Sequence, residues 1–332
     1  MSWIDRLLAL APRSARTSAA TGLVFPPDFL ASLERLRLVA LKAIGGGLRE
    51  GHRLGAYKGG QLEFHGHRSY SPGDELRYID WNSYARLGKP YVKEFAREEA
   101  GVLHILIDCT PSMSLGAPSK WIFARRVAAL FAHVAYSSKD SVFVYMFGAD
   151  GELSQFPRRG LRGGIRLCMD FLEKAALSAP RRIAEESQPG RVERGSAAVL
   201  ARTVSNFLRL SSARGRTIVI SDFWQEEQDI VGGLSRLSSA GYDISGIHVL
   251  APEELQPDTQ GELLARSVEE EGEVRLSASS DLGARYTKEL ETHRACVEEV
   301  FKKRGGMYLF ERCDTSIERV LIATLRQRRW VT

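Results

Sequence analysis

Cysteine is scarce in this 332-residue chain, and its four cysteines lie far apart without a Cys-x-x-Cys pair. This usage argues against a disulfide framework or a zinc site and favours reduced thiols in the cytoplasm. No stretch approaches the ~18 consecutive apolar residues that a membrane-spanning helix needs. Charged residues interrupt the first ten positions, which are too short for a signal-peptide core. We therefore expect a cytoplasmic protein without a membrane span.

Several sequence patterns typical of enzymes are also missing. The chain has no Gly-x-x-x-x-Gly-Lys-[Ser/Thr] loop, no Gly-x-Ser-x-Gly and no His-Glu-x-x-His. Net charge is +5, but the positive residues are scattered without a dense basic run. Such scatter is typical of a solvated surface and not of a nucleic-acid site. These absences weigh against nucleotide hydrolysis, serine-hydrolase and zinc-protease chemistry, and nucleic-acid binding.

Apolar residues make up 44% of the chain, enough to bury a full core in one large domain with appendages. We expect an N-terminal segment and linker at 1–26, then a helix plus a small β-rich subdomain at 27–100. From 101 to 332, strand-like and helix-like segments alternate, which predicts an α/β domain with a doubly wound, mostly parallel sheet. Glutamates around Gly272 predict an exposed hairpin inserted at 258–279.

The central strand of this domain is predicted at Val102–Asp108, an almost uncharged run that ends in a carboxylate. Thr110 and Ser112 follow it, and a second buried strand ends at Asp222. Parallel α/β sheets place ligands at the carboxyl ends of their strands, and these oxygen donors suit Mg²⁺. The alternative is that Thr110, Ser112 and Asp222 only cap the helices that follow them.

Two motifs resemble known families. Asp108-x-Thr110-x-Ser112 and Asp222 resemble the metal-ion-dependent adhesion site of the von Willebrand factor A domain. A longer motif upstream resembles the hallmark of a bacterial family, domain-of-unknown-function family 58. It comprises Tyr70-x-Pro72-Gly73-Asp74-x-x-Arg77-x-Ile79-Asp80-Trp81, Ala85-Arg86, Lys93-Glu94-Phe95 and Glu98.

The resemblance implies a von Willebrand factor A-like fold over 101–332 and a partner among MoxR-type AAA+ ATPases, whose genes often lie beside those of the family. It also implies that Thr110 and Ser112 bind the metal directly, that the aspartates act largely through waters, and that an acidic side chain of a partner completes the shell. One position departs from the pattern. Arg194 stands where a threonine is expected, and a one-turn adjustment offers Ser196 instead. The Arg194 guanidinium would replace or repel the cation, so Mg²⁺ occupancy stays open.

The upstream motif also has a physical interpretation. Ser71–Asp74 suits a type II turn, in which Pro72 sets φ and Gly73 supplies a positive φ. Ile79 and Trp81 have the character of core residues. The charged residues of the motif predict an ion-pair network, or alternatively a surface on which Arg77 and Arg86 face a partner. The members of the predicted network are Arg77, Asp80, Arg86, Glu94 and Glu98.

Two functions follow from these patterns. The first is a non-enzymatic interaction module, an adaptor or partner of a MoxR-type AAA+ ATPase, that binds acidic side chains. Its metal ligands would be Asp108, Thr110, Ser112 and Asp222, and its partner contacts Arg77, Arg86 and Arg194. The second is a metal-dependent phosphoester hydrolase. The first is favoured because phosphoaspartyl hydrolases need an aspartate at position 110, and because His104 lies inside the strand and not beside the site.

Overall fold

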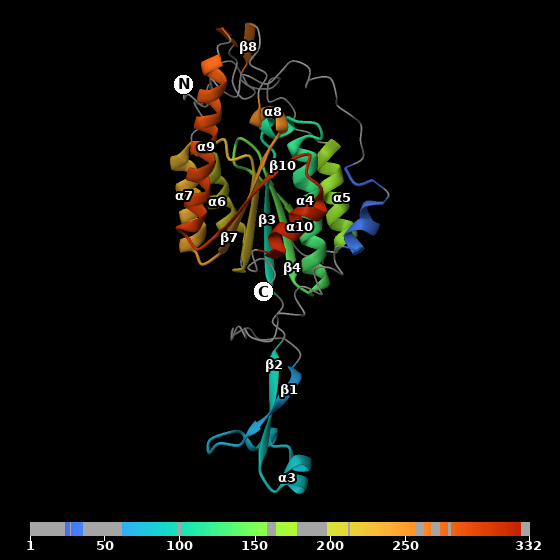
Figure 1. Ribbon diagram of the computed structural model, residues 1–332. Helices are drawn as coiled ribbons and strands as arrows, with labels where there is room; N and C mark the ends of the chain where they lie inside the picture. The colour runs from blue at the N-terminus through green and yellow to red at the C-terminus, as the bar shows by residue number, and fades with distance from the viewer. Residues whose placement is uncertain are drawn as a thin grey trace. The chain divides into compact units, whose positions relative to one another are not determined.

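The computed structural model describes residues 24–26, 28–35, 62–97, 101–157, 164–177, 198–211, 213–256, 262–266, 273–277 and 280–326. The chain forms two compact units, one at residues 50–101 and the other comprising the rest (Figure 1). No helix among the described residues combines the length and the apolar character needed to cross a bilayer.

The larger unit is built on a six-stranded sheet with the strand order β10-β7-β6-β3-β4-β5. Its parallel strands are β3 (Val102–Asp108), β4 (Ser141–Phe147), β6 (Arg216–Ser221), β7 (Asp243–Leu250) and β10 (Met307–Arg312). The edge strand β5 (Leu153–Phe156) runs antiparallel to β4. The predicted mixed α/β fold with a mostly parallel sheet is confirmed.

Helices cover both faces of this sheet (Figure 1). Successive residues of β3 point to opposite faces, so Ile105 packs in the core on one face and Leu106 in the core on the other. The first face is covered by α4 (Lys120–Ser137), α5 (Ile165–Leu177) and α10 (Ile317–Arg326). The second is covered by α6 (Val199–Leu210), α7 (Glu227–Ser239) and α9 (Ser280–Lys302).

Short elements follow two strands at the carboxyl edge of the sheet. The 3-10 turn η4 (Pro111–Ser114) follows β3, and the helix α8 (Pro252–Leu255) follows β7. Beyond α8, β8 (Glu262–Arg266) and β9 (Glu273–Ser277) pair antiparallel, within the segment where the sequence predicts a hairpin.

The smaller unit consists of an antiparallel ribbon and the segment that connects its two strands. The ribbon pairs β1 (Leu62–Ser69) with β2 (Tyr91–Arg97), and the connection holds η3 (Leu76–Tyr78) and α3 (Trp81–Leu87). Gly73 has a φ of 110°, and Asp74 N donates to Ser71 O at 3.1 Å, as the type II turn requires.

The helix near the N-terminus belongs to the larger unit. The prediction from the sequence grouped it with the β-rich segment that forms the smaller unit. This helix is described over residues 29–35, and residues 36–61 lie outside the described residues. Phe29 and Leu33 are buried in the core that α4 and β3 share. Arg126 of α4 donates to Val24 O at 2.7 Å, which ties the segment before this helix to the same unit.

Candidate functional site

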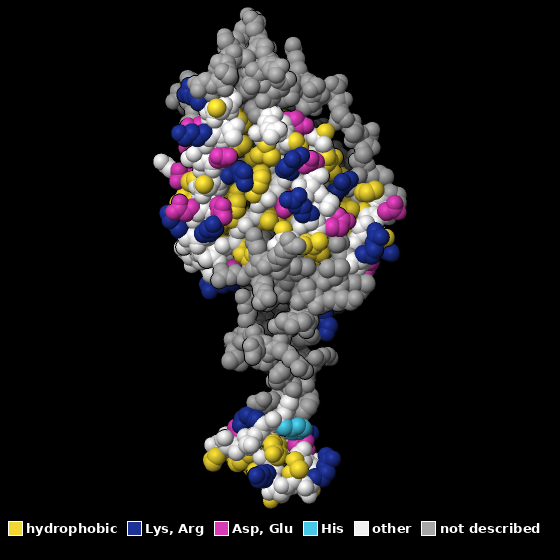
Figure 2. Space-filling view, in the orientation of Figure 1, with side chains coloured by type: hydrophobic (Ala, Val, Ile, Leu, Met, Phe, Trp, Pro, Cys, Tyr) yellow, Lys and Arg dark blue, Asp and Glu magenta, His cyan; other side chains and the backbone are white. Residues whose placement is uncertain are grey.

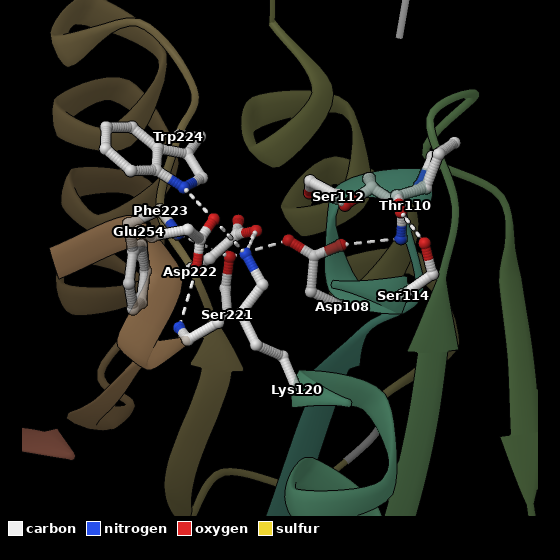
Figure 3. A network of polar contacts seen from close by, with 12 residues as sticks. Asp108, Thr110, Ser112, Ser114, Lys120, Ser221, Asp222, Phe223, Trp224 and Glu254 are labelled. Atoms are coloured by element: carbon white, nitrogen blue, oxygen red, sulfur yellow. Dashed lines mark hydrogen bonds and ion pairs between the residues drawn. The ribbon is translucent and has the colours of Figure 1, made fainter. Parts of the chain in front are cut away.

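The two aspartates singled out from the sequence end neighbouring strands. Asp108 is the last residue of β3, and Asp222 directly follows β6. The two strands pair in parallel, so both carboxylates emerge at the same edge of the sheet, as predicted (Figure 3). Neither residue is exposed to solvent, and Thr110 and Ser112 are also buried.

Three groups donate hydrogen bonds to the carboxylate of Asp108. Its Oδ1 accepts from Thr110 N at 2.9 Å, while its Oδ2 accepts from Ser221 Oγ at 2.6 Å and from Gln225 Nε2 at 3.2 Å. The hydroxyls of Thr110 and Ser112 lie 3.0 Å apart. Burial and the nearby charge of Asp222 raise the pKa of Asp108 to about 6. The two carboxylates therefore repel one another in a dry environment.

The contacts do not agree with the alternative that Thr110, Ser112 and Asp222 only cap the helices that follow them. Helix α4 is capped by Ser119, whose Oγ accepts from Ile122 N at 3.3 Å. Thr110 precedes η4 without a side-chain capping bond, and α7 begins after Glu226, which also makes none. The carboxylate of Asp222 is engaged elsewhere, by Lys120.

Lys120 is the main site residue that the sequence analysis missed. Its side chain is fully buried, and its Nζ donates to Asp222 Oδ2 at 2.7 Å and to Glu254 Oε1 at 2.6 Å (Figure 3). Burial lowers the pKa of Lys120, but the charges of Asp222 and Glu254 outweigh that effect and raise the pKa above its ordinary value. A lysine at the start of the apolar α4 segment was the available signal, yet its partners come from distant parts of the chain.

The chain turns sharply just after Asp222. Phe223 is fully buried and has a φ of 48°, which is unusual for a residue with a bulky side chain. Its N donates to Ser221 Oγ at 2.9 Å, and its O accepts from His293 Nε2 at 2.8 Å. Nearby, His248 Nδ1 lies 2.7 Å from the Tyr308 hydroxyl. Burial lowers the pKa of both histidines, so they are neutral at physiological pH.

The donor set at this edge fits a small divalent cation in both chemistry and charge. All candidate ligands are oxygens, which Mg²⁺ prefers. With Asp108, Asp222 and Glu254 ionised, the single positive charge of Lys120 leaves a net charge of −2. Asp222 Oδ1 is buried and has no hydrogen-bond partner among the described residues. Within the same residues no group of three His, Cys, Asp or Glu could hold a metal, so a cation here depends on the hydroxyls as well.

The remaining predicted site residues have different outcomes. Arg194 and Ser196 lie outside the described residues. Arg77 and Arg86 are exposed on the smaller unit, where Arg77 pairs with Glu75 and Arg86 Nε donates to Asn82 O at 3.5 Å. Figure 2 shows hydrophobic side chains beside Lys and Arg on this unit. Its exposed large apolar residues are Leu76, Trp81, Tyr84 and Leu87.

Two expectations about this motif were wrong. Trp81 opens a short helix and is 62% exposed, so it does not belong to a core; its ring packs edge-on against Tyr84, with ring centroids 6.2 Å apart. Asp80 does not join an arginine network. Its carboxylate accepts from Asn82 N and Ser83 N, which caps α3, and lies 2.6 Å from His67 Nε2. The side chains of Glu94 and Glu98 lie outside the described residues.

Fold and site together define a doubly wound α/β protein with a buried, oxygen-rich polar cluster at the carboxyl ends of adjacent strands. The chain belongs to the family described as protein of unknown function DUF58, which matches residues 66–296. This membership confirms the resemblance carried by the upstream motif.

Similar chains are known from several bacteria. Uncharacterized protein Mb1516 of Mycobacterium bovis and uncharacterized protein Rv1480 of Mycobacterium tuberculosis are each 25% identical over 314 residues, which cover 90% of this chain and 92% of theirs. Two solved structures are each 17% identical and match 69% of this chain. They are an aerotolerance-related membrane protein from Bacteroides fragilis (TM-score 0.40, 98% of that chain) and the conserved hypothetical protein BatB from Bacteroides thetaiotaomicron (TM-score 0.41, 100% of that chain).

Proposed function

We propose that this chain is a non-enzymatic protein-interaction module of the von Willebrand factor A type, which binds an acidic side chain of a partner. The observation that carries the proposal is the placement of Asp108 and Asp222 at the ends of adjacent parallel strands, next to the paired hydroxyls of Thr110 and Ser112. Because all four side chains are buried, the site must open to admit a partner's carboxylate.

In this proposal a bound Mg²⁺ supplies the positive charge that attracts the partner's carboxylate. Thr110 and Ser112 would hold the ion through their hydroxyls, and Asp108 and Asp222 largely through waters. Asp222 Oδ1, which lacks a hydrogen-bond partner in the described part of the chain, and the net charge of −2 support this assignment. If Arg194 takes the place of the ion, its guanidinium would pair with the same carboxylate without a metal.

The histidines near the site support a binding role over phosphoester hydrolysis. His104 lies four residues before Asp108, and its Nε2 contacts Ala213 O at 2.9 Å. His293 is engaged by Phe223 O, and His248 by the Tyr308 hydroxyl. Each of these imidazoles is buried and committed to a structural contact, so none is an obvious general base. Turnover of a phosphatase substrate panel by purified protein would favour the hydrolase instead.

The proposed partner is a MoxR-type AAA+ ATPase, or a protein on which that ATPase acts. The exposed residues Arg77, Trp81 and Arg86 of the smaller unit are proposed as a second contact. Exposed Trp, Tyr and Arg residues are enriched in protein interfaces, which supports a role in binding.

Co-purification tests this proposal. The tagged chain and a MoxR-type ATPase encoded in the same genome are co-expressed, with Mg²⁺ or with EDTA. We expect Asp108→Asn combined with Ser112→Ala to reduce the recovered ATPase strongly, because both ligand types are lost. Ser114→Ala is the matched control, since that hydroxyl lies in the same turn but is exposed and bonds Pro111 O.

The chelator distinguishes the two modes of recognition. Loss of the ATPase in EDTA supports a bridging Mg²⁺, while EDTA-resistant binding supports Arg194. Equal recovery with the double variant and with wild type would contradict the proposal. Charge reversal at Arg77 and Arg86 would then locate the contact on the smaller unit.

A further inference from the structure

We infer that the ammonium group of Lys120 acts as a built-in positive charge of the site. It gives Asp222 a permanent counter-charge that keeps the surrounding loops folded without a divalent ion, and it weakens the binding of such an ion. This inference rests on the proposed function, because it concerns the same cluster of carboxylates. It assigns Lys120 and Glu254 as positioning residues, since neither needs to touch the partner.

Lys120 connects three segments that meet at one edge of the sheet. The lysine begins α4, Asp222 follows β6, and Glu254 lies in α8, which follows β7. All three side chains are buried, and Nζ donates to one oxygen of each carboxylate. In a dry environment such an ion pair holds its partners together, because separation would leave uncompensated charges.

Groups other than Lys120 also hold Glu254 in place. Its Oε1 also accepts from Trp224 Nε1 at 3.1 Å, and its Oε2 accepts from Ala251 N at 2.7 Å. Tyr286 donates to Glu254 O. This carboxylate is therefore held by groups outside the ion pair. Lys120 is in turn kept next to Asp222, because swinging away would leave Glu254 buried and unpaired.

The charge count explains why the lysine weakens cation binding. Asp108, Asp222 and Glu254 carry three negative charges against the one positive charge of Lys120. Without the lysine the site would have a net charge of −3, and ligand charge is a main determinant of divalent-ion affinity. The ammonium also occupies Asp222 Oδ2, which leaves only Oδ1 of that carboxylate without a partner among the described residues.

The experiment replaces Lys120 with methionine, which keeps the apolar stem and removes the charge. Mn²⁺ binding is followed by calorimetry, and the melting temperature is measured in EDTA and in excess Mn²⁺. We expect Lys120→Met to bind Mn²⁺ at least about tenfold more tightly than wild type. In EDTA the melting temperature of Lys120→Met should be lower than that of wild type, and excess Mn²⁺ should restore it. The melting temperature of wild type should depend little on the ion. Lys302→Met, at an exposed lysine paired with Glu298, is the control and should match wild type.

A second pair of variants decides the outcome if Lys120→Met does not fold. Glu254→Gln should weaken Mn²⁺ binding, because it removes one negative charge. Adding Lys120→Met to that variant removes the whole ion pair, a change that buried pairs often tolerate. The double variant should bind Mn²⁺ about tenfold more tightly than Glu254→Gln alone. No gain in affinity on removing Lys120, in either background, would overturn the inference. Such a result leaves partner recognition through Arg194 unaffected, and that is tested separately by co-purification.

Discussion

The Ser221 hydroxyl on β6 donates a hydrogen bond to the Asp108 carboxylate at the end of the neighbouring strand β3, with 2.6 Å between Oγ and Oδ2. The same Oγ accepts from Phe223 N, so one hydroxyl both holds the site carboxylate and supports the turn at Phe223. We expect Ser221→Ala to lower the free energy of unfolding by about 1–3 kcal/mol, because it leaves buried polar groups unpaired. Urea unfolding of the variant measures the loss. Ser114→Ala should change it by less than ~0.5 kcal/mol, and equal effects of the two variants would show that the Ser221 contact is unimportant.

The smaller unit offers a contrast between two adjacent residues. Asp80 caps α3 through Asn82 N and Ser83 N, whereas the Trp81 side chain is largely exposed. Asp80→Ala should therefore destabilise α3 by about 1 kcal/mol through loss of the cap. Trp81→Ala should leave the helix nearly unchanged. Hydrogen exchange of the amides of residues 81–87 compares the two variants, and faster exchange in Trp81→Ala than in Asp80→Ala would restore the interpretation of Trp81 as a core residue.

The main sheet and the meeting of Asp108 with Asp222 were predictable because they depend on local patterns. Buried parallel strands are continuous apolar runs, and the runs of β3 and β6 each stop at an aspartate. Once the strands are parallel and adjacent, the chain direction places both carboxylates at one edge. The cap at Asp80 also had a local signal, an aspartate directly before a helical segment, although its charge favoured the prediction of an ion-pair network.

Lys120 and Trp81 could not be placed from the sequence because their environments depend on tertiary structure. Glu254 is 134 positions away from Lys120, and no local pattern indicates that the two side chains pair in the interior. An isolated lysine before an apolar helix is equally compatible with a solvated helix end. Trp81 has the composition of a core residue, but burial requires other elements to pack over it, and among the described residues it keeps 62% of its surface exposed.

Two adjacent glycines in α7 are expected to respond in opposite ways to the same substitution. A Cβ at Gly232 would meet no atom within 4 Å, so Gly232→Ala should stabilise the protein by about 0.5–1 kcal/mol through helix propensity. A Cβ at Gly233 would lie 2.9 Å from Leu200 Cγ and 3.3 Å from its carbonyl carbon. Gly233→Ala should therefore cost about 1–3 kcal/mol, since α6 must move away. Thermal unfolding of both variants tests the close approach of α6 and α7, and a gain in stability at both positions would disprove it.

His104 makes a contribution to the stability of the larger unit that is lost in mild acid. Its imidazole is buried, stacks on Phe143 with ring centroids 5.4 Å apart, and contacts Ala213 O through Nε2. Burial lowers the pKa of His104 from 6.5 to about 4. Between these two values the unfolded chain binds a proton that the folded chain does not, so stability decreases as the pH falls through this window. Each pKa unit corresponds to ~1.4 kcal/mol, so His104 alone accounts for roughly 3 kcal/mol of the loss.

His104→Phe tests this contribution. The substitution loses the contact with Ala213 O, so the variant should be somewhat less stable than wild type at neutral pH. Its free energy of unfolding is measured with urea from pH 7 to pH 4, and it should lose less stability on acidification than wild type does. His248 and His293 contribute a further loss in acid, and Asp108, whose pKa is raised, contributes in the opposite direction in both proteins. Tyr242→Phe is the control, because that ring also packs against His104 but the substitution keeps the imidazole. The other titratable ring in contact, Tyr145, has its pKa raised further by burial and does not ionise in this range. If His104→Phe and Tyr242→Phe show the same pH dependence as wild type, His104 is protonated equally in the folded and unfolded chains.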